Sequence, residues 1–332
     1  MTWNVELGAV TVSAPARLHW GLINESGTGG RVDGGVGLAL SSPSWTVHMG
    51  SNLRSRLSGE HNEVAERVVA RLSREWGTEP CGVLFGSVIP FHVGLGAKTS
   101  LTLAVARGYA ELRGVPVRTA DIAALLGRGG TSGVGVHVSD GGGLVVEYGH
   151  RFPEDKQTFG PSSSRLATGV PDLAHRFRWP DSWKVILVQL GGKGLSGAAE
   201  RAFFNANCPV PAQDTAEILH LVKTTLLPSI ERRYLPGVQD YLRATQRLGL
   251  KVREWTTQSS DVTKLRHQWA CIESECRLIS PLCLSSLGPQ LFMVSDNPTV
   301  ELGCLRRLRL PPGSFTVGEA TNNGVLVRST PQ

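Results

Sequence analysis

Three absences in the sequence narrow the class of protein. No apolar run is long enough to cross a bilayer, and the first residues, MTWNVELGAV, show no basic segment followed by an apolar core. We therefore expect a cytoplasmic protein with no signal peptide and no membrane span. The chain also lacks a concentrated basic stripe, since its 34 basic and 28 acidic residues are dispersed around a formal net charge of +6. This disfavours nucleic acid as a partner and suits a small anionic substrate.

Cysteine is infrequent and shows no ligand pattern. The six residues are Cys81, Cys208, Cys271, Cys276, Cys283 and Cys304. No two of them have the C-x-x-C spacing typical of zinc or redox sites. We expect reduced thiols that lie mostly in the core, and a metal cluster of Cys271, Cys276 and Cys283 is the less favoured alternative.

Glycine, in contrast, is abundant, with 39 residues, and it is concentrated in four loops that together hold 18 of them. The loops are GLINESGTGGRVDGGVGLAL (21–40), IPFHVGLGAKTSL (89–101), LLGRGGTSGVGVHV (125–138) and LVQLGGKGLSGAAERAF (187–203). The second and fourth lead from a strand into a helix, a layout in which backbone N–H groups and the helix N-terminus bind anions. The second is not a Walker A loop, because that motif needs glycine where this chain has His92 and Ala97. Tight turns also use glycine, so a purely structural role is the alternative for any single loop.

Hydrophobic periodicity predicts an α+β protein in two halves that meet near residues 150–180. In the first half we expect strands at 5–13, 44–49 and 81–89, a hairpin formed by 134–140 and 143–149, and helices at 61–76, 98–113 and 119–126. Residues 151–183 are rich in proline, serine and charge, which indicates a linker or flexible loop. In the second half we expect strands at 183–190, 291–296, 314–320 and 323–329, and helices at 196–205, 213–233, 237–255, 261–278 and 298–307.

Several motifs carry a resemblance to a known family. The segment Pro90-x-x-x-Gly94-Leu95-Gly96-Ala97 resembles the second motif of the GHMP small-molecule kinase superfamily. A longer set resembles β-ribofuranosylaminobenzene 5′-phosphate synthases and runs from about residue 14 to 206: ARLHWGLIN, GRVDGGVGLAL, PFHVGLGAKTSLTLAVA, GRGGTSGVGV and GKGLSGAAERAFF. Weaker matches are LSSLGPQLF and NNGVLV. Together these motifs are specific, whereas the glycine loop alone is not.

The resemblance implies a fold, an assembly and a reaction. The fold is GHMP-kinase-like, with an N-terminal domain similar to domain 2 of ribosomal protein S5 over residues 1–165 and a ferredoxin-like C-terminal domain over 166–332. The assembly is a homodimer. The implied reaction transfers ribose 5-phosphate from phosphoribosyl pyrophosphate (PRPP) to a ring carbon of an aromatic acid, while CO₂ and pyrophosphate leave. Mg²⁺ on the diphosphate and the ribose hydroxyls is the expected cofactor.

Two departures from the family pattern bear on the acceptor. The second motif usually continues Gly-Ser-Gly-Thr-Gln, but this chain has Gly96-Ala97-Lys98-Thr99-Ser100. The C-terminal motif usually reads Gln-Ser-Ser-Trp-Gly-Pro, but here Leu284 and Leu287 replace the glutamine and the tryptophan. A lost tryptophan predicts a reshaped aromatic pocket. We therefore expect a C-nucleoside antibiotic synthase of the formycin and pyrazofurin type, with an amino-pyrazole acid as acceptor. The alternative is a synthase acting on 4-aminobenzoate or 4-hydroxybenzoate for a methanopterin-type cofactor.

The glycine loops and their flanks supply the candidate site. For PRPP we expect Arg31, Gly94, Gly96, Lys98, Thr99, Ser100, Arg128, Gly129, Gly130, Thr131 and Ser132; for the acceptor we expect Lys193, Ser196 and His92. Arg17 and His19 share one face of a strand and join Asp33 as candidate catalytic residues. Asp33 would either ligate Mg²⁺ or support the cationic transition state, and a turn-forming role before two glycines is the open alternative. Structural alternatives also stand for Arg128 as a surface ion pair and for Ser196 as a helix cap.

Two other functional classes remain open. An ATP-dependent small-molecule kinase of the same superfamily would bind a polyphosphate at the same loop. A non-catalytic nucleic-acid or protein-binding module is the third class, and the dispersed charge and the four glycine loops argue against it. The sequence shows no nucleophilic triad, and the expected reaction needs no covalent intermediate.

Overall fold

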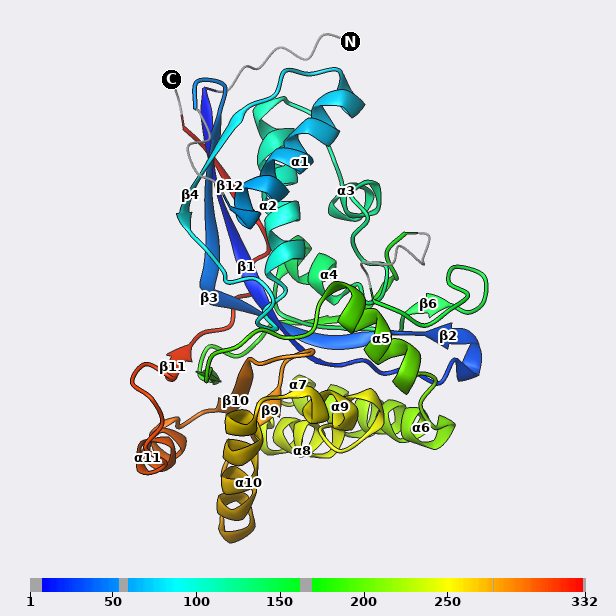
Figure 1. Ribbon diagram of the computed structural model, residues 1–332, viewed down its shortest axis with the longest axis vertical. Helices are drawn as coiled ribbons and strands as arrows, with labels where there is room; N and C mark the ends of the chain where they lie inside the picture. The colour runs from blue at the N-terminus through cyan, green and yellow to red at the C-terminus, as the bar shows by residue number, and fades with distance from the viewer. Residues whose placement is uncertain (1–7, 54–58, 162–168, 277, 331–332) are drawn as a thin grey trace.

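A long antiparallel pair of strands forms the centre of the structure (Figure 1). The computed structural model describes residues 8–53, 59–161, 169–276 and 278–330. Strand β1 spans Ala9–Gly21 and β3 spans Gly35–Gly50, and the two pair along nearly their whole length. In the first part of β1, Val10, Val12 and Ala14 are buried and alternate with more exposed polar residues. This period of two is what a half-buried strand requires.

The central pair belongs to a six-stranded sheet that draws strands from the whole chain. The order is β12-β1-β3-β5-β7, with β4 paired to β3. The added strands are β4 (Gly82–Ser87), β5 (Leu144–Glu147), β7 (Leu173–Phe177) and β12 (Leu326–Thr330). A separate short pair joins β2 (Arg31–Val32) to β6 (His150–Arg151). The last strand of the chain therefore lies beside the first.

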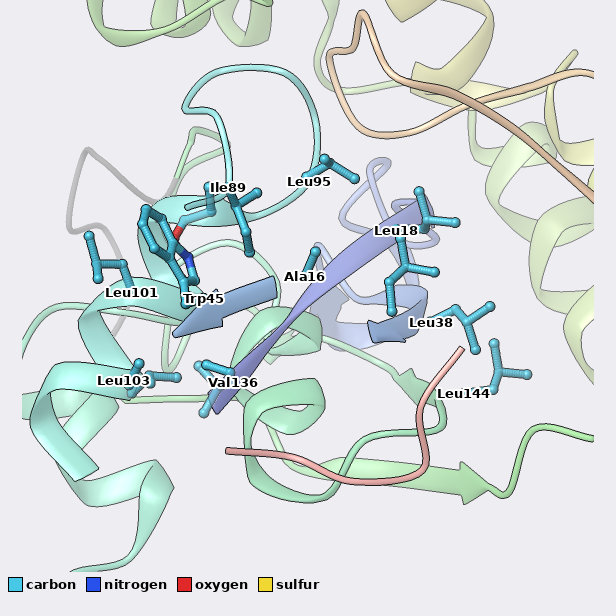
Figure 2. Packing of buried hydrophobic residues seen from close by; sticks show 14 of the residues in the cluster. Ala16, Leu18, Leu38, Trp45, Ile89, Leu95, Leu101, Leu103, Val136 and Leu144 are labelled. Carbon is cyan, nitrogen blue, oxygen red and sulfur yellow. The ribbon is translucent and has the colours of Figure 1, made fainter. Parts of the chain in front are cut away.

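Helices cover this sheet and enclose a large apolar core (Figure 2). Helix α1 spans Glu60–Trp76 and α2 spans Ala97–Leu112, and both contact the sheet, whereas α3 (Thr119–Leu125) packs against α2. Trp45 of β3 is fully buried in this core and donates its indole N–H to the carbonyl oxygen of Ala97 over 3.2 Å. The contact fixes the first turn of α2 against the sheet, which matters because that turn reaches the site.

A second, four-stranded sheet has the order β11-β8-β10-β9. Its strands are β8 (Lys184–Val188), β9 (Cys283–Leu284), β10 (Leu291–Ser295) and β11 (Phe315–Gly318). The accompanying helices are α5 (Gly197–Asn207), α6 (Ala212–Leu221), α7 (Leu227–Glu231), α8 (Leu235–Thr245), α9 (Gly249–Glu254), α10 (Ser260–Glu275) and α11 (Thr299–Arg307), with a π-helical segment at Val222–Leu226. Figure 1 shows these helices gathered below the first sheet, with α5 between them and α4 (Val134–Gly141).

The hairpin predicted at 134–140 and 143–149 is wrong in its first half. Residues Val134–Gly141 form helix α4, and only the second half becomes a strand, β5. Val134, Val136 and Val138 are all buried, because α4 packs against α2 and against three strands of the sheet. A short helix covered on several sides places alternate valines in the core, and this imitates the period of a strand.

The linker predicted at 151–183 is also corrected in part. Strand β7 lies within it and pairs antiparallel with β5 at the edge of the first sheet. Residues 162–168 of the predicted linker lie outside the described residues. The division at 165/166 stays a prediction, and the structure adds that two later strands, β7 and β12, belong to the first sheet.

Other predicted elements are confirmed, some with large changes of extent. The strands predicted at 5–13 and 44–49 are parts of the longer β1 and β3, with residues 5–7 outside the described residues, and the helix predicted at 237–255 is divided into α8 and α9. The helix predicted at 61–76 is α1, with Val64, Val68 and Leu72 buried as its spacing requires. The strand predicted at 81–89 is the shorter β4, which pairs with β3 and is mostly half-exposed. Across the described segments, no helix combines the length and the apolar character that a bilayer crossing needs.

Candidate active site

A cavity of about 350 Å³ opens where three of the four glycine-rich loops meet, those at 89–101, 125–138 and 187–203, while Leu22 is the residue of 21–40 that lines it. Its wall draws on β1, the loop into α2, the loop before α4, the start of α5 and the loop after β9. The polar lining residues are Arg17, His19, His92, Lys98, Thr99, Arg128, Thr131, Ser132, Ser196, Glu200, Glu254 and Ser286. The apolar lining includes Leu22, Leu195, Phe204 and Leu287. The cavity therefore combines cations, backbone amides and a hydrophobic wall.

Hydrogen bonds between the loops hold this arrangement together. The Gly194 amide donates to the carbonyl oxygen of His92 over 2.6 Å, and the Gln290 amide donates to that of Val93 over 2.9 Å. The hydroxyl of Ser285 donates to the carbonyl oxygen of Gly94 over 2.7 Å. The loops at 89–101, 187–203 and 284–290 are thus one bonded unit.

Two glycines are required for this close approach. A Cβ at Gly94, whose φ is +94°, would lie 2.5 Å from the carbonyl oxygen of Ser285. A Cβ at Gly194 would lie 2.1 Å from the carbonyl oxygen of Gly288. Both contacts are to backbone, which cannot move aside cheaply. The density of glycine in these loops therefore serves the contact between them.

Arg17 carries an incompletely bonded positive charge into the cavity. Its Nη1 donates to the carbonyl oxygen of Gly94 at a long 3.4 Å, and its buried Nε has no hydrogen-bond partner among the described residues. Burial lowers the pKa of Arg17 to about 10, while Glu254 and Glu200 oppose the shift. The guanidinium is still cationic at neutral pH. A desolvated cation with an unused donor favours an anionic ligand at this place.

The first turn of α2 adds further positive character. Gly96 caps the helix in a left-handed conformation with φ of 66°, and Lys98 and Thr99 follow on the cavity wall. Arg128 reaches the cavity from the opposite loop, where its Nε donates to the carbonyl oxygen of Gly127 over 3.1 Å. Unbonded backbone amides of the first turn and the two cations surround one volume, as an anion site requires.

His19 stands at the start of a hydrogen-bonded chain that leads out of the cavity. Its Nε2 lies 3.2 Å from Oγ of Ser132, and that hydroxyl donates over 2.9 Å to Oε1 of Glu147. Burial lowers the pKa of His19 well below its usual value, and the charges of Arg17 and Lys251 lower it further. His19 is therefore neutral at neutral pH. Ser285 fixes its backbone by accepting the amide N–H of His19 over 3.0 Å.

Most of the predicted site residues are brought together by the structure. The cavity wall contains Arg17, His19, His92, Gly94, Gly96, Lys98, Thr99, Arg128, Gly129, Thr131, Ser132 and Ser196. His92 also lies within 3.2 Å of Oε1 of Glu60 through its Nε2 atom. Ser196 occupies the N-cap position of α5 but makes no side-chain capping bond there, so its hydroxyl is available to the cavity.

Five predicted residues do not line the cavity, which corrects the direct contacts expected of them. Arg31 is exposed and donates to the carbonyl oxygen of Gly149 over 2.8 Å. Ser100 is buried behind the wall, where it donates to the carbonyl oxygen of Pro15 over 2.6 Å. Gly130 is buried beside lining residues, and Lys193 is exposed outside the lining.

Asp33 is the fifth, and its position excludes contact with a ligand in the cavity. It is fully buried, and its two oxygens accept hydrogen bonds of 3.0 and 2.7 Å from Nζ of Lys156. The same Lys156 donates to the carbonyl oxygen of Gly160 over 3.1 Å, and Thr131 donates to that oxygen over 2.8 Å. Asp33 therefore supports the cavity wall through Lys156 and Thr131. Asp33 also has the left-handed backbone conformation of a turn residue, with a φ of 67°.

The sequence interpretation missed Glu147 and Lys156. Glu147 ends the apolar run LVVE, and an acidic residue there is a detectable sign, because charged residues are rarely fully buried without a reason. Lys156 lies in the stretch taken for a linker, so no comparable sign pointed to it. Within the part of the chain that the structure describes, no three His, Cys, Asp or Glu side chains converge as metal ligands.

Comparison with known proteins agrees with this geometry. Residues 63–142 match the family model for the GHMP kinases N terminal domain. The β-ribofuranosylphenol 5′-phosphate synthase of Archaeoglobus fulgidus is 37% identical over 284 residues, which are 85% of this chain and 87% of that protein. The protein of the same name from Methanothermobacter thermautotrophicus is 30% identical over 333 residues, or 95% of this chain and 98% of the relative.

The chain belongs to the β-ribofuranosylphenol 5′-phosphate synthase family. This confirms the family predicted from the motifs, whereas the closer likeness to C-nucleoside synthases stays a prediction. A homoserine kinase from Cytophaga hutchinsonii matches with a TM-score of 0.63 at 13% identity, covering 99% of this chain and 100% of that one. A putative sugar kinase from Campylobacter jejuni matches with a TM-score of 0.65 at 14% identity, covering 98% and 100%. These likenesses confirm the predicted GHMP-kinase-like α+β fold of this synthase family member.

Proposed function

We propose that this synthase family member transfers ribose 5-phosphate from PRPP to a ring carbon of a phenolic carboxylic acid, with 4-hydroxybenzoate as the simplest acceptor. CO₂ and pyrophosphate leave, and a C–C glycosidic bond forms. The name of the curated relatives describes a product with ribose 5-phosphate on a phenol. That name supports a phenolic acceptor, the alternative in our sequence interpretation, over the amino-pyrazole acid that we first favoured.

The observation that carries the proposal is the buried guanidinium of Arg17, whose Nε has no hydrogen-bond partner among the described residues, beside the first turn of α2. PRPP is anionic at both ends, and three cationic side chains line the cavity: Arg17, Lys98 and Arg128. The apolar wall of Leu195, Phe204 and Leu287 offers a place for an aromatic ring next to them. A cavity with cations next to an apolar wall can bind a sugar phosphate and an aromatic ring side by side.

In the proposed reaction, the cavity residues stabilise charge and orient the donor. The C1–O bond of PRPP breaks, and its electron pair leaves with the diphosphate. The ring carbon that bears the carboxylate attacks C1, and loss of CO₂ returns an electron pair to the ring. The cations of the cavity stabilise the leaving diphosphate, while the neutral state of His19 adds no repulsion to the cationic sugar. Thr99, Ser132 and the backbone amides orient the donor.

Mg²⁺ fits the cavity as a companion of the diphosphate. Glu200 and Glu254 both line the wall, and Mg²⁺ usually takes one or two protein carboxylates together with substrate phosphates. Glu200 would hold the ion from the protein side, whereas the carboxylate of Glu254 is already paired with Nζ of Lys251. When bound, Mg²⁺ supplies charge stabilisation to the leaving group.

A second candidate acceptor is a heteroaromatic amino acid such as an amino-pyrazole carboxylate. Leu287 favours it, because this residue lines the cavity at the position where the family pattern has tryptophan. It packs in an apolar cluster with Phe203, Phe204 and Leu250. A smaller side chain there changes the shape available to the ring, which is the basis for C-nucleoside synthesis as the second reading.

One assay separates these readings. The protein is incubated with PRPP, Mg²⁺ and a panel of 4-hydroxybenzoate, 4-aminobenzoate and an amino-pyrazole dicarboxylate, and release of CO₂ and pyrophosphate is followed. We expect equimolar release with 4-hydroxybenzoate; preference for the pyrazole would instead establish the second candidate. Calorimetric titration with PRPP and with ATP, each with Mg²⁺, is run beside it. Tight binding of ATP without binding of PRPP would overturn the proposal in favour of a kinase.

A further inference from the structure

Three side chains from three distant segments form one hydrogen-bonded chain at the cavity wall. His19 comes from β1, Ser132 from the loop before α4, and Glu147 from β5. His19 and Ser132 line the cavity, whereas Glu147 lies behind them with no exposed surface. The two links, Nε2 to Oγ and Oγ to Oε1, measure 3.2 and 2.9 Å. Proton transfer is possible along such a chain, because each link is within hydrogen-bond distance.

The donors and acceptors of the chain fix the state of His19. Ser132 has one hydroxyl proton, and an ionised Glu147 takes it in a hydrogen bond. Oγ of Ser132 then acts as acceptor toward Nε2–H of His19. The Nδ1 atom keeps its lone pair, and it bonds no other described residue. The geometry thus gives the cavity a proton acceptor.

We propose that His19, Ser132 and Glu147 form a proton relay that takes the proton of the acceptor's ring hydroxyl during C–C bond formation and returns it after CO₂ is lost. The inference rests on the proposed function and adds the residues that raise the reactivity of the acceptor ring. His19 is the residue that contacts the acceptor, and Glu147 acts through it. A neutral phenol is a weak carbon nucleophile, and removal of its proton places charge on the ring carbons ortho and para to the oxygen.

The relay balances without another reactant. As the ring oxygen gives its proton to Nδ1, Nε2 gives its own to Ser132, and the serine gives its proton to Oε1 of Glu147. The imidazole is neutral before and after the step. The ring carbon bonds to C1, the diphosphate leaves, and the C–C bond to the carboxylate breaks with its electron pair returning to the ring. The three protons then move back, so the protein regains its first state.

The surroundings explain why the proton would rest on Glu147 rather than on His19. Burial and the cations Arg17 and Lys251 oppose an imidazolium at His19. The pKa of Glu147 is raised to about 8, mainly by burial and to a smaller extent by the nearby carboxylate of Asp33. Hydrogen bonds from Ser132 and from the amides of Gly149 and Gly133 act in the opposite direction. Glu147 is therefore poised to hold or release a proton near neutral pH, as a relay requires.

The test compares wild type, Ser132→Ala and Glu147→Gln at saturating PRPP and Mg²⁺ over pH 6 to 10. Only ionised Glu147 can take the proton, so kcat of the wild type with 4-hydroxybenzoate should rise with pH toward a plateau above about pH 8. Both variants should lose roughly 10²-fold in kcat with little change in KM. Their remaining activity should rise only near pH 9 to 10, where a free phenol begins to ionise.

A second acceptor provides the matched control. In 4-dimethylaminobenzoate the electron-donating nitrogen carries no proton, so the reaction needs no proton transfer through the relay. With this acceptor we expect Ser132→Ala to lose much less of its kcat than it loses with 4-hydroxybenzoate, and we expect no rise in kcat toward pH 8 in either protein. Ser132→Ala keeps the relay testable if Glu147→Gln does not fold, which thermal unfolding reports.

Two results would overturn the inference, and they are distinguishable. If the variants keep the wild-type pH profile and kcat with 4-hydroxybenzoate, the relay is wrong although the transfer function stands. If the wild type releases no pyrophosphate with any acceptor of the panel, the proposed function fails and the relay with it.

Discussion

At the scale of single residues, Arg17 gives the sharpest test of the anion site. The Arg17→Met variant keeps an apolar stem of similar length and removes the charge and its unbonded Nε. We expect PRPP affinity to fall by roughly 10- to 100-fold, as for the loss of a charge-assisted hydrogen bond. The melting temperature should be unchanged or higher, because a desolvated cation is removed. Calorimetry and thermal unfolding measure both, and wild-type affinity for PRPP in this variant would contradict the assignment.

Lys98 is exposed, and we expect it to contribute less than Arg17 to PRPP binding. The Lys98→Ala variant should bind PRPP several-fold less tightly at low salt, and the difference should shrink as salt is raised, since exposed charges are screened. Lys193→Ala is the matched control, because Lys193 is exposed on the neighbouring loop but lies outside the cavity lining. Equal losses in the two variants would indicate general attraction between charges instead of a defined contact. Titration calorimetry at two salt concentrations distinguishes these outcomes.

Glu147 predicts a pH dependence of stability. Burial raises its pKa from the ordinary 4.5 to about 8, so the folded protein binds this proton more tightly than the unfolded chain. Its contribution is complete below about pH 4.5 and is lost as the pH rises to about 8. The unfolding free energy of Glu147→Gln should therefore decline less between pH 5 and 8 than that of the wild type. Glu25, whose pKa burial also raises, contributes to both proteins alike. Urea unfolding at several pH values provides the comparison, and parallel curves would refute this prediction.

Residue types alone identified the cations of the site better than its carboxylates. Arg17, Lys98 and Arg128 all line the cavity, whereas Arg31 and Lys193, which also lie in glycine loops, do not. Asp33 looked equally suitable, but its partner Lys156 is 123 positions away in the sequence. No local pattern reveals such a pair. The ion pair with the distant Lys156 determines that Asp33 supports the cavity wall and does not face a ligand.

At the scale of elements, the contact between the loops at 89–101 and 284–290 is the most sensitive to substitution. Gly94→Ala would force a methyl group to within 2.5 Å of the carbonyl oxygen of Ser285, at a φ of +94° that alanine rarely adopts. We expect a loss of stability of roughly 1–3 kcal/mol and a larger loss of PRPP binding, because the cavity wall must open. Gly191→Ala is a useful control: it also has positive φ, but a Cβ there meets nothing within 4 Å. Similar PRPP affinities in the two variants would show that strain, not the loop contact, is what matters.

Element prediction succeeded where one face of an element is solvent-exposed and failed where several faces are covered. Helix α1 has a single buried stripe, and its limits were predicted to within one residue. Helix α4 is covered by α2 and by the sheet, so its valines carry no helical period. Strand β7 was missed because its residues, LAHRF, are only half-buried at a sheet edge. In both cases the determining contacts come from elsewhere in the chain.

At the scale of the whole molecule, the topology predicts that the first half does not fold alone. The six-stranded sheet takes β7 and β12 from beyond residue 165, and β12 pairs with β1 at five positions, from Ala9 to Ser13. The carbonyl oxygen of Ser139 at the end of α4 also accepts the amide of Val325, next to β12. A fragment of residues 1–165 would expose both edges of β1–β3–β5 and part of its core.

We therefore expect the 1–165 fragment to lack a cooperative thermal transition. A permuted fragment, in which residues 320–330 are joined ahead of residue 8 through a flexible linker, should show a partial cooperative transition. A permutant is the fitting control because it restores β12 to its neighbour without adding the second sheet. Near-UV circular dichroism and calorimetric unfolding of the fragment, the permutant and the full chain make the comparison. A fragment that unfolds cooperatively at the temperature of the full chain would show that the first sheet is stable without its late strands.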